Sequence, residues 1–280
     1  MNSTTHTLVS TSWLQQHLDA PNLILLDASP AATAEGKQSK HGSNTIAGAR
    51  HFDLKGRFSD PSSAFPNTLP TAEQFEAECQ RLGINQSSSI VVFDNLGIYT
   101  SPRVWWMFKV MGHQNVAVLD GGLPAWIEAG FAVANTTVEA DQPGNFTATF
   151  DPQQVASYED MVAHAAANNF LVVDARSAGR FAGTAPEPRK QLQSGHIPHS
   201  ISIPYAEVLH NGRYKSVPEL QALFHEKGAD GGSPVFSCGS GLTACIVLLA
   251  YELSHDNPTR VYDGSWTEWA ERQGLHTNAQ

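Results

Sequence analysis

Short runs of apolar residues recur along the chain, and loops and helical patterns separate them. Continuous apolar runs are typical of strands buried on both faces of a parallel sheet. Apolar positions with helical spacing occur at 72–82, 102–111 and 242–253. The clearest apolar runs end at Asp27, Asp94, Asp174 and Cys238. The alternation predicts an α/β fold, with a mainly parallel sheet and helices on both faces.

The second half of the chain repeats the first. Leu-Leu-Asp-Ala at 25–28 matches Val-Val-Asp-Ala at 172–175, and both indicate a buried strand that ends in an acidic turn. Asp-Gly-Gly-Leu at 120–123 matches Asp-Gly-Ser-Trp at 263–266. The landmarks keep their order and nearly equal separations, which indicates two tandem copies of one structural unit.

The repeat predicts the domain organisation. We expect an N-terminal domain at 1–134, a polar linker at 135–152 and a C-terminal domain at 153–280. Asp94 stands where the second copy has Cys238, and a carboxylate is a poor nucleophile toward sulfur. The N-terminal domain is therefore expected to be inactive.

Composition narrows the class of protein. The chain has 280 residues and a formal net charge of −10, so a nucleic-acid partner is not expected. Three cysteines cannot all pair, which favours a reducing compartment. The first twenty residues carry no Lys or Arg, and the longest apolar run, at 244–251, is too short to span a membrane. We expect a cytoplasmic protein without a membrane partner.

Cys238 is the strongest candidate for chemistry. It follows a short apolar strand, and a glycine-rich loop leads from it into an apolar helix. Loop N–H groups and the unpaired N–H groups of a helix start both favour a thiolate. Cys79 and Cys245 lie within helical patterns and are expected to be structural.

The residues around Cys238 disfavour some reactions. A cysteine phosphatase needs an Arg six residues after the nucleophile to bind phosphate oxygens, and that position is Ala244. A cysteine hydrolase needs a histidine base, and the loop contains none, so such a base would have to come from elsewhere in the fold. Attack on sulfur requires only a thiolate and surroundings that tolerate an anion.

These motifs resemble the tandem rhodanese-domain sulfurtransferases. Residues 238–244, Cys-Gly-Ser-Gly-Leu-Thr-Ala, are similar to the Cys-Gly-Ser-Gly-Val-Thr-Ala loop of the branch that uses 3-mercaptopyruvate. The resemblance implies that the cysteine takes sulfur from 3-mercaptopyruvate as a persulfide and releases pyruvate. It also implies an acceptor thiol, such as thioredoxin or glutathione, or cyanide as acceptor. No metal and no organic cofactor is implied.

The resemblance also assigns roles to individual residues. Arg180 and Arg189 match arginines that bind the substrate carboxylate, and Ser240 matches a serine that assists proton delivery to the leaving enolate. Thr243 has an alternative role as a helix cap. The remaining loop residues expected to contact substrate are Gly239, Gly241, Leu242 and Thr243.

Two alternatives remain open at this point. The chain could prefer thiosulfate, although its loop has neutral Gly239 and Ser240 where the thiosulfate branch has basic residues. It could also be a binding module that keeps the fold without catalysis, because fold alone does not prove function. The chain departs from the family at Asn67, where relatives have histidine, and at His199, where they have glycine.

Overall fold

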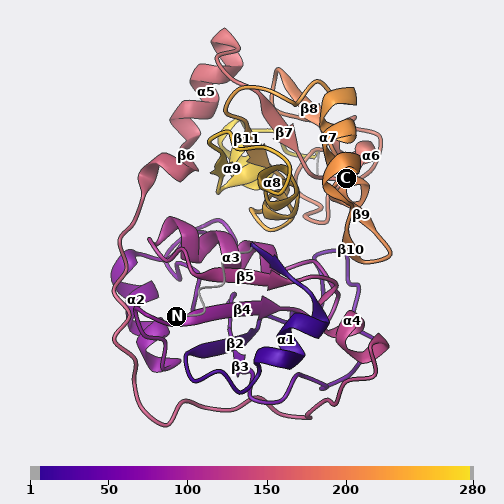
Figure 1. The fold of residues 1–280 in the computed structure, drawn as a ribbon. Coiled ribbons are helices and arrows are strands. Elements are labelled where there is room, and N and C mark those ends of the chain that lie inside the picture. Colours follow the sequence, from indigo (N-terminus) through magenta and orange to yellow (C-terminus); the bar gives the residue numbers. More distant parts are fainter. Residues whose placement is uncertain (1–6, 278–280) are drawn as a thin grey trace. The chain divides into compact units, whose positions relative to one another are not determined.

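The computed structural model describes residues 7–277, which form two compact units. Unit 1 consists of residues up to Pro61, Leu69–Asp151 and Asn211–Arg213, and unit 2 of Ser62–Thr68, Pro152–His210 and residues from Tyr214 onward. Figure 1 shows the course of the chain through both units.

Unit 1 is built on a parallel sheet of five strands (Figure 1). The middle strand pairs in parallel with its neighbour on each side. In spatial order the strands are β1 (Leu8–Val9), β5 (Val116–Leu119), β4 (Ser89–Phe93), β2 (Leu23–Asp27) and β3 (Arg50–His51).

Alternate residues of these strands face opposite layers of helices. Leu25 and Val91 belong to a core cluster with Leu14 of α1 and Trp126 of α4. On the other layer α3 contacts β4 and β5, and its Phe108 packs edge-on against a phenylalanine of α2. The helices are α1 (Thr11–His17), α2 (Ala72–Arg81), α3 (Ser101–Val110) and α4 (Gly122–Glu128).

Unit 2 has the same strand order as unit 1, again with all strands parallel. The predicted α/β architecture, with a parallel sheet and helices in each half of the chain, is confirmed. The strands, in spatial order, are β6 (Val155–Ala156), β12 (Arg260–Tyr262), β11 (Val235–Ser237), β7 (Val172–Asp174) and β8 (Ser200–Ser202).

Helices α5 and α9 contribute to one core cluster with the sheet of unit 2, in which Met161, Val235 and Trp266 are buried. Helix α8 contacts β11 and β12, and α7 contacts α8. The helices are α5 (Tyr158–Ala167), α6 (Ala178–Phe181), α7 (Val217–Glu226), α8 (Thr243–Glu252) and α9 (Ser265–Arg272). Two short 3₁₀ turns, Pro152–Gln154 and Tyr205–Val208, and a small sheet of β9 (Leu209–His210) and β10 (Arg213–Tyr214) complete the elements.

The segment predicted as a linker packs along unit 1. Phe146 is fully buried and lies edge-on to Phe75 and Phe108. The Gly144 N–H also donates to the Gln80 carbonyl at 2.7 Å. Unit 1 thus extends to Asp151, beyond the expected domain end at 134, and unit 2 includes the earlier segment Ser62–Thr68.

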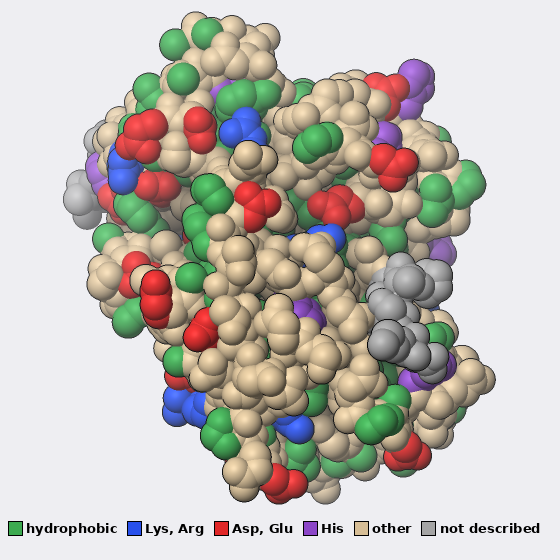
Figure 2. All heavy atoms as spheres, turned by 60° about the vertical axis from the view of Figure 1, so that its left-hand side comes forward, with side chains coloured by type: hydrophobic (Ala, Val, Ile, Leu, Met, Phe, Trp, Pro, Cys, Tyr) green, Lys and Arg blue, Asp and Glu red, His purple; other side chains and the backbone are tan. Residues whose placement is uncertain are grey.

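Figure 2 shows Asp and Glu side chains scattered over the face that it draws, with Lys and Arg side chains at separate places between them. Among the residues described, no helix combines the length and apolarity needed to cross a bilayer.

Gly122 marks a position where the fold of unit 1 requires glycine. Its φ is +53°, and a Cβ there would lie 2.5 Å from the carbonyl oxygens of Asp94 and Gly97. Gly130 is also left-handed, with φ +77°, but a Cβ at that residue would meet only open space. A side chain at Gly130 would therefore meet backbone strain alone, whereas one at Gly122 would meet both strain and steric overlap.

We expect Gly122→Ala to lower the free energy of unfolding by about 3 kcal/mol, because strain and overlap add. Gly130→Ala should cost about 1 kcal/mol, from the left-handed backbone alone. Denaturant unfolding of both variants measures the difference. Equal losses would contradict the packing described for Gly122.

Candidate active site

Cys238 lies at the carboxyl end of β11, the middle strand of the unit 2 sheet. Ligands of such sheets bind beyond the carboxyl ends of the strands. The residue is 2% exposed, and the loop 239–242 leads from it into α8. The strand, loop and helix predicted around this cysteine are thus present.

Ser265, at the start of α9, organises the cysteine loop. Its Oγ accepts hydrogen bonds from the N–H groups of Cys238 and Gly241, both at 3.1 Å. The same hydroxyl lies 2.9 Å from the Tyr262 carbonyl and 4.0 Å from Cys238 Sγ. Ser265 is fully buried and has φ +51°. A neutral hydroxyl therefore satisfies two loop N–H groups directly beside the sulfur.

The next residues of α9 hold the loop from the same side. The Trp266 N–H donates to the Cys238 carbonyl at 2.9 Å. The Gly239 carbonyl accepts from the Thr267 N–H at 3.1 Å and from its Oγ1 at 2.6 Å. Sequence reasoning gave no role to Ser265 or Thr267. The repeat does align Ser265 with Gly122, and these two aligned residues share a left-handed backbone.

Unit 1 shows how the equivalent loop is stabilised without a cysteine. The Asp94 carboxylate accepts hydrogen bonds from its own loop, and the Asp94 carbonyl accepts from Leu123 as Cys238 accepts from Trp266. The donors to the carboxylate are the N–H groups of Leu96, Tyr99, Thr100 and Ser101 and the Ser101 hydroxyl, at 2.7–3.0 Å. A loop of this design surrounds a negative charge with N–H groups.

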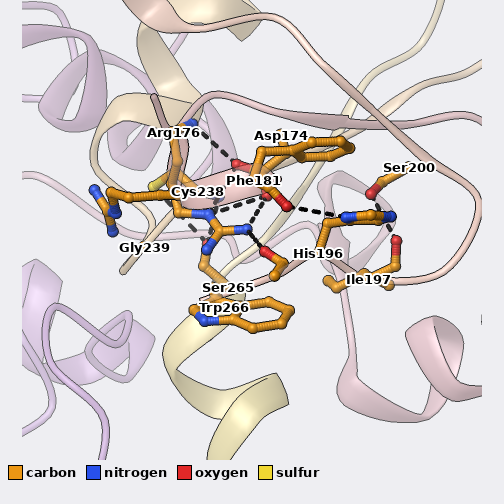
Figure 3. A network of polar contacts seen from close by, with 12 residues as sticks. Asp174, Arg176, Phe181, His196, Ile197, Ser200, Cys238, Gly239, Ser265 and Trp266 are labelled. Atoms are coloured by element: carbon orange, nitrogen blue, oxygen red, sulfur yellow. Dashed lines mark hydrogen bonds and ion pairs between the residues drawn. The ribbon is translucent and has the colours of Figure 1, made fainter. Parts of the chain in front are cut away.

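A buried ion network supports the loop of unit 2 (Figure 3). Arg176 forms salt bridges with Asp174 and, at 2.7 Å, with Glu187. Its guanidinium also lies 4.5 Å from the ring centre of Trp266. Asp174 ends β7 beside β11, so the network joins the sheet to α9.

Glu187 connects this network to Arg180. Its carboxylate accepts from Arg180 Nη2 at 2.6 Å and from Arg180 Nε at 3.1 Å. A Cβ at Gly239 would lie 2.7 Å from Arg180 Nη2, so a larger residue at position 239 would displace the guanidinium from the loop. The structure thus brings together Arg180 and Gly239, two of the expected site residues, and adds Glu187, for which sequence reasoning gave no role.

Arg189 is the second predicted arginine near the loop. Its Nη1 donates to Thr267 Oγ1 at 3.1 Å. Burial and the charge of Arg180 lower the pKa of Arg189, while Glu187 and the Cys238 thiolate act in the opposite direction. Arginine stays charged despite such a shift, so a partly buried cation lies within electrostatic reach of the sulfur.

Arg189 and Thr267 also line a cavity of about 460 Å³, which is within the usual size range of ligand pockets. Its wall carries two arginines and one carboxylate among apolar and polar groups. The lining residues are Ala64, Phe65, Pro66, Arg189, Gln191, Thr267, Glu271 and Arg272.

The remaining predicted loop residues have distinct positions. Ser240 lies beside Asn67, whose amide Nδ2 is 3.0 Å from Ser240 Oγ and 3.1 Å from the Ser240 carbonyl oxygen. Gly241 has φ +77°, which suits glycine. Leu242 is the N-cap of α8 and Thr243 its first residue, so the alternative in which Thr243 caps the helix is wrong.

The other two cysteines have no comparable setting. Cys79 is fully buried in α2, and burial raises the pKa of its thiol well above the ordinary range. Cys245 is buried inside α8, and its Sγ lies 3.3 Å from the Gly241 carbonyl. The three cysteines all lie in the described part of the chain, and none forms a disulfide.

Comparison with known proteins places this geometry in a family. The profile of the Rhodanese-like domain matches residues 10–129 and again 157–272. A tandem rhodanese-domain protein is therefore the class that fold and loop define. The crystal structure of SseA from Escherichia coli, described as a 3-mercaptopyruvate sulfotransferase, superposes with a TM-score of 0.82. It is 33% identical and covers 94% of this chain and 99% of its own.

Sequence relatives agree with the structural match. The 3-mercaptopyruvate sulfurtransferase of Mus musculus is 41% identical, over 94% of this chain and 91% of the mouse protein. A thiosulfate sulfurtransferase of Rattus norvegicus is 37% identical, over 95% of this chain and 92% of the rat protein. The chain belongs to the rhodanese family of two-domain sulfurtransferases.

The ion network predicts a large stability difference between two glutamates of unit 2. Glu187→Gln should lower the free energy of unfolding by about 3 kcal/mol, because two arginines lose a buried counter-charge. The control Glu159→Gln should cost less than about 1 kcal/mol, since Glu159 is 77% exposed and pairs with Arg272 only at 3.5 Å. Thermal and denaturant unfolding measure both variants. Similar losses would show that Glu187 is not a centre of the network.

Proposed function

We propose that this enzyme transfers the sulfur of 3-mercaptopyruvate to an acceptor through a persulfide on Cys238. The observation that carries the proposal is the setting of this thiol. It ends the middle strand of its sheet, on a loop held by Ser265, and the cations Arg180 and Arg189 lie nearby. Cys79 and Cys245 lack this combination.

The first half-reaction balances without a further reactant. The Cys238 thiolate attacks the donor sulfur, an S–S bond forms, and the bond from sulfur to C3 of the donor breaks. The bonding electron pair passes to the enolate of pyruvate. The proton of the donor thiol ends on C3 of pyruvate, and the enzyme keeps a persulfide anion. These steps need no metal and no organic cofactor.

The charge distribution favours a monoanionic 2-oxo acid as donor. Glu187 already offsets the charge of Arg180, so Arg189 is proposed as the main partner of the substrate carboxylate, with Arg180 shaping the loop. Gly239, Ser240, Gly241, Leu242 and Thr243 add no positive side chain. A dianionic donor would gain less from this surface than from a loop with basic residues.

Thiosulfate is the second candidate donor, because the chain is also similar to a thiosulfate sulfurtransferase. The ratio of turnover with the two donors decides between them. A non-catalytic binding module is disfavoured, since such a module does not need a cysteine at the end of β11 or two arginines beside it.

The second half-reaction transfers the outer sulfur to a nucleophile. An acceptor thiolate or cyanide attacks that sulfur, the S–S bond breaks, and the Cys238 thiolate is restored. Glutathione, thioredoxin and cyanide all satisfy this chemistry, and the cytoplasm supplies such thiols in reduced form. The cavity beside Arg189 has room for an acceptor larger than cyanide.

Cys238→Ser should abolish persulfide formation and turnover. Wild-type protein incubated with 3-mercaptopyruvate and no acceptor should gain about 32 Da, one sulfur atom, on the peptide that contains Cys238. The matched controls Cys79→Ser and Cys245→Ser should keep most activity. Sulfur on another residue, or turnover by Cys238→Ser, would place the chemistry elsewhere.

Arg189→Ala should lower kcat/KM for 3-mercaptopyruvate by about 10- to 100-fold, since a charged hydrogen bond contributes about 1.5–3 kcal/mol. Alkylation of Cys238 by neutral iodoacetamide should change much less. The control Lys190→Ala removes the neighbouring, exposed cation and should leave both rates near wild type. Parallel losses in catalysis and alkylation would mean that Arg189 acts on the thiol and does not bind the carboxylate.

A further inference from the structure

The geometry points to Asn67 as a positioning residue for the proposed reaction. We infer that its amide fixes Ser240 as a hydrogen-bond donor toward the 2-oxo oxygen of the substrate. This inference rests on the proposed function, and it adds a residue that acts through another. Asn67 belongs to Ser62–Thr68, the early segment that is part of unit 2.

The orientation of the Asn67 amide follows from its partners. Nδ2 lies 3.1 Å from the Ser240 carbonyl oxygen, which can only accept a hydrogen bond. The NH₂ end of the amide, and not its oxygen, must therefore face Ser240. The same nitrogen lies 3.0 Å from Ser240 Oγ and can donate its second hydrogen there. Asn67 is 9% exposed, so water competes little for these bonds.

This contact decides what the Ser240 hydroxyl can do. A hydroxyl has one proton to donate and two lone pairs that accept. Because Oγ already accepts from Asn67, its own O–H bond must point away from that amide. Among the described residues, Ser240 Oγ accepts from Asn67 and makes no hydrogen bond in which it is the donor. The hydroxyl is thus left as a donor, and donation by Asn67 strengthens it through cooperative polarisation.

The proposed reaction requires such a donor. As the bond between sulfur and C3 breaks, negative charge develops on the 2-oxo oxygen of the departing enolate. A hydrogen bond that strengthens as this charge develops stabilises the transition state more than the bound substrate. Ser240 is two residues from Cys238 and can supply that bond, while Arg189 is left to bind the carboxylate.

The residue type at position 67 has two physical consequences. Its φ is +59°, a backbone region in which Asn, Asp, His and especially Gly are favoured over other residues. An amide also keeps the same charge at every pH used for assay, whereas a histidine at this position would titrate near its ordinary pKa of about 6.5. We therefore expect the orientation of Ser240 to be independent of pH.

Two substitutions tolerated by the left-handed backbone test the role of the amide. Asn67→Gly removes the donor without backbone strain and should lower kcat/KM for 3-mercaptopyruvate about tenfold. Asn67→Asp replaces the donor by an acceptor that captures the Ser240 proton, and should lower it about 100-fold. Wild-type values for both variants would overturn the inference.

A double-mutant cycle tests whether Asn67 acts through Ser240. In a Ser240→Ala background, Asn67→Gly should change kcat/KM by no more than about twofold, because the hydroxyl it orients is gone. Full additivity of the two effects would overturn the inference.

A purely structural role for Asn67 would give a different pattern. We expect Asn67→Gly to keep the wild-type rate of Cys238 alkylation by iodoacetamide. The rate at which cyanide discharges a persulfide loaded by long incubation with 3-mercaptopyruvate should also be unchanged, since no enolate forms in that step. If both rates fall together with kcat/KM, Asn67 only holds the loop and the inference is wrong.

Asn67→His tests the dependence on pH. The ratio of its kcat/KM to that of wild type should change across about pH 6–7, where an imidazole takes up a proton. The other titratable groups on the elements packed against the loop are common to both proteins and cancel in the ratio. They are Cys238, Arg180, Glu187 and Arg189. A ratio that stays constant would show that position 67 is not coupled to the reaction.

Different results would contradict the proposed function and the role of Asn67. If wild-type protein forms no persulfide and releases no pyruvate from 3-mercaptopyruvate, both are overturned. If the wild type reacts and Asn67→Gly matches it, the role of Asn67 alone is wrong.

Discussion

Buried N–H groups at the end of the middle strand need an acceptor, and the two units meet this requirement in different ways. In unit 1 the Asp94 carboxylate accepts them, and a negative charge is thereby fixed as part of the structure. In unit 2 the Ser265 hydroxyl accepts from Cys238 and Gly241. Because this acceptor comes from another element, the side chain at the strand end is not needed for structure. A reactive sulfur can therefore stand there, and the same sheet supports chemistry in one copy only.

The arginines around the loop differ in how far nearby carboxylates offset their charge. Glu187 lies between Arg176 and Arg180, so one buried carboxylate offsets two cations. Arg176 joins the network to the sheet through Asp174, and Arg180 lies against Gly239. Buried charges are stable only when they are paired in this way. Arg189 makes a neutral contact with a threonine hydroxyl, and it is the cation whose charge is least offset by nearby carboxylates in the site described.

Much of this arrangement could be predicted from the sequence, because it depends on local pattern. The apolar runs gave the strands, the repeat gave the matched sheets, and the glycines marked the loop after Cys238. The contacts made by Asn67 and Ser265 could not be predicted, since they join segments far apart in the chain. The polar composition of 135–152 predicted a linker, because composition does not show that a single side chain, Phe146, is buried against unit 1.

The central claim is that Ser265 keeps the loop in shape while leaving the sulfur of Cys238 to react. Ser265→Gly tests it most directly, because glycine accepts the φ of +51° and occurs at the matching position of unit 1. The measurement is the single-turnover rate of persulfide formation on Cys238 from 3-mercaptopyruvate. We predict a folded protein in which this rate falls about tenfold or more, since two loop N–H groups lose their acceptor. A folded variant that forms the persulfide at the wild-type rate would contradict the claim.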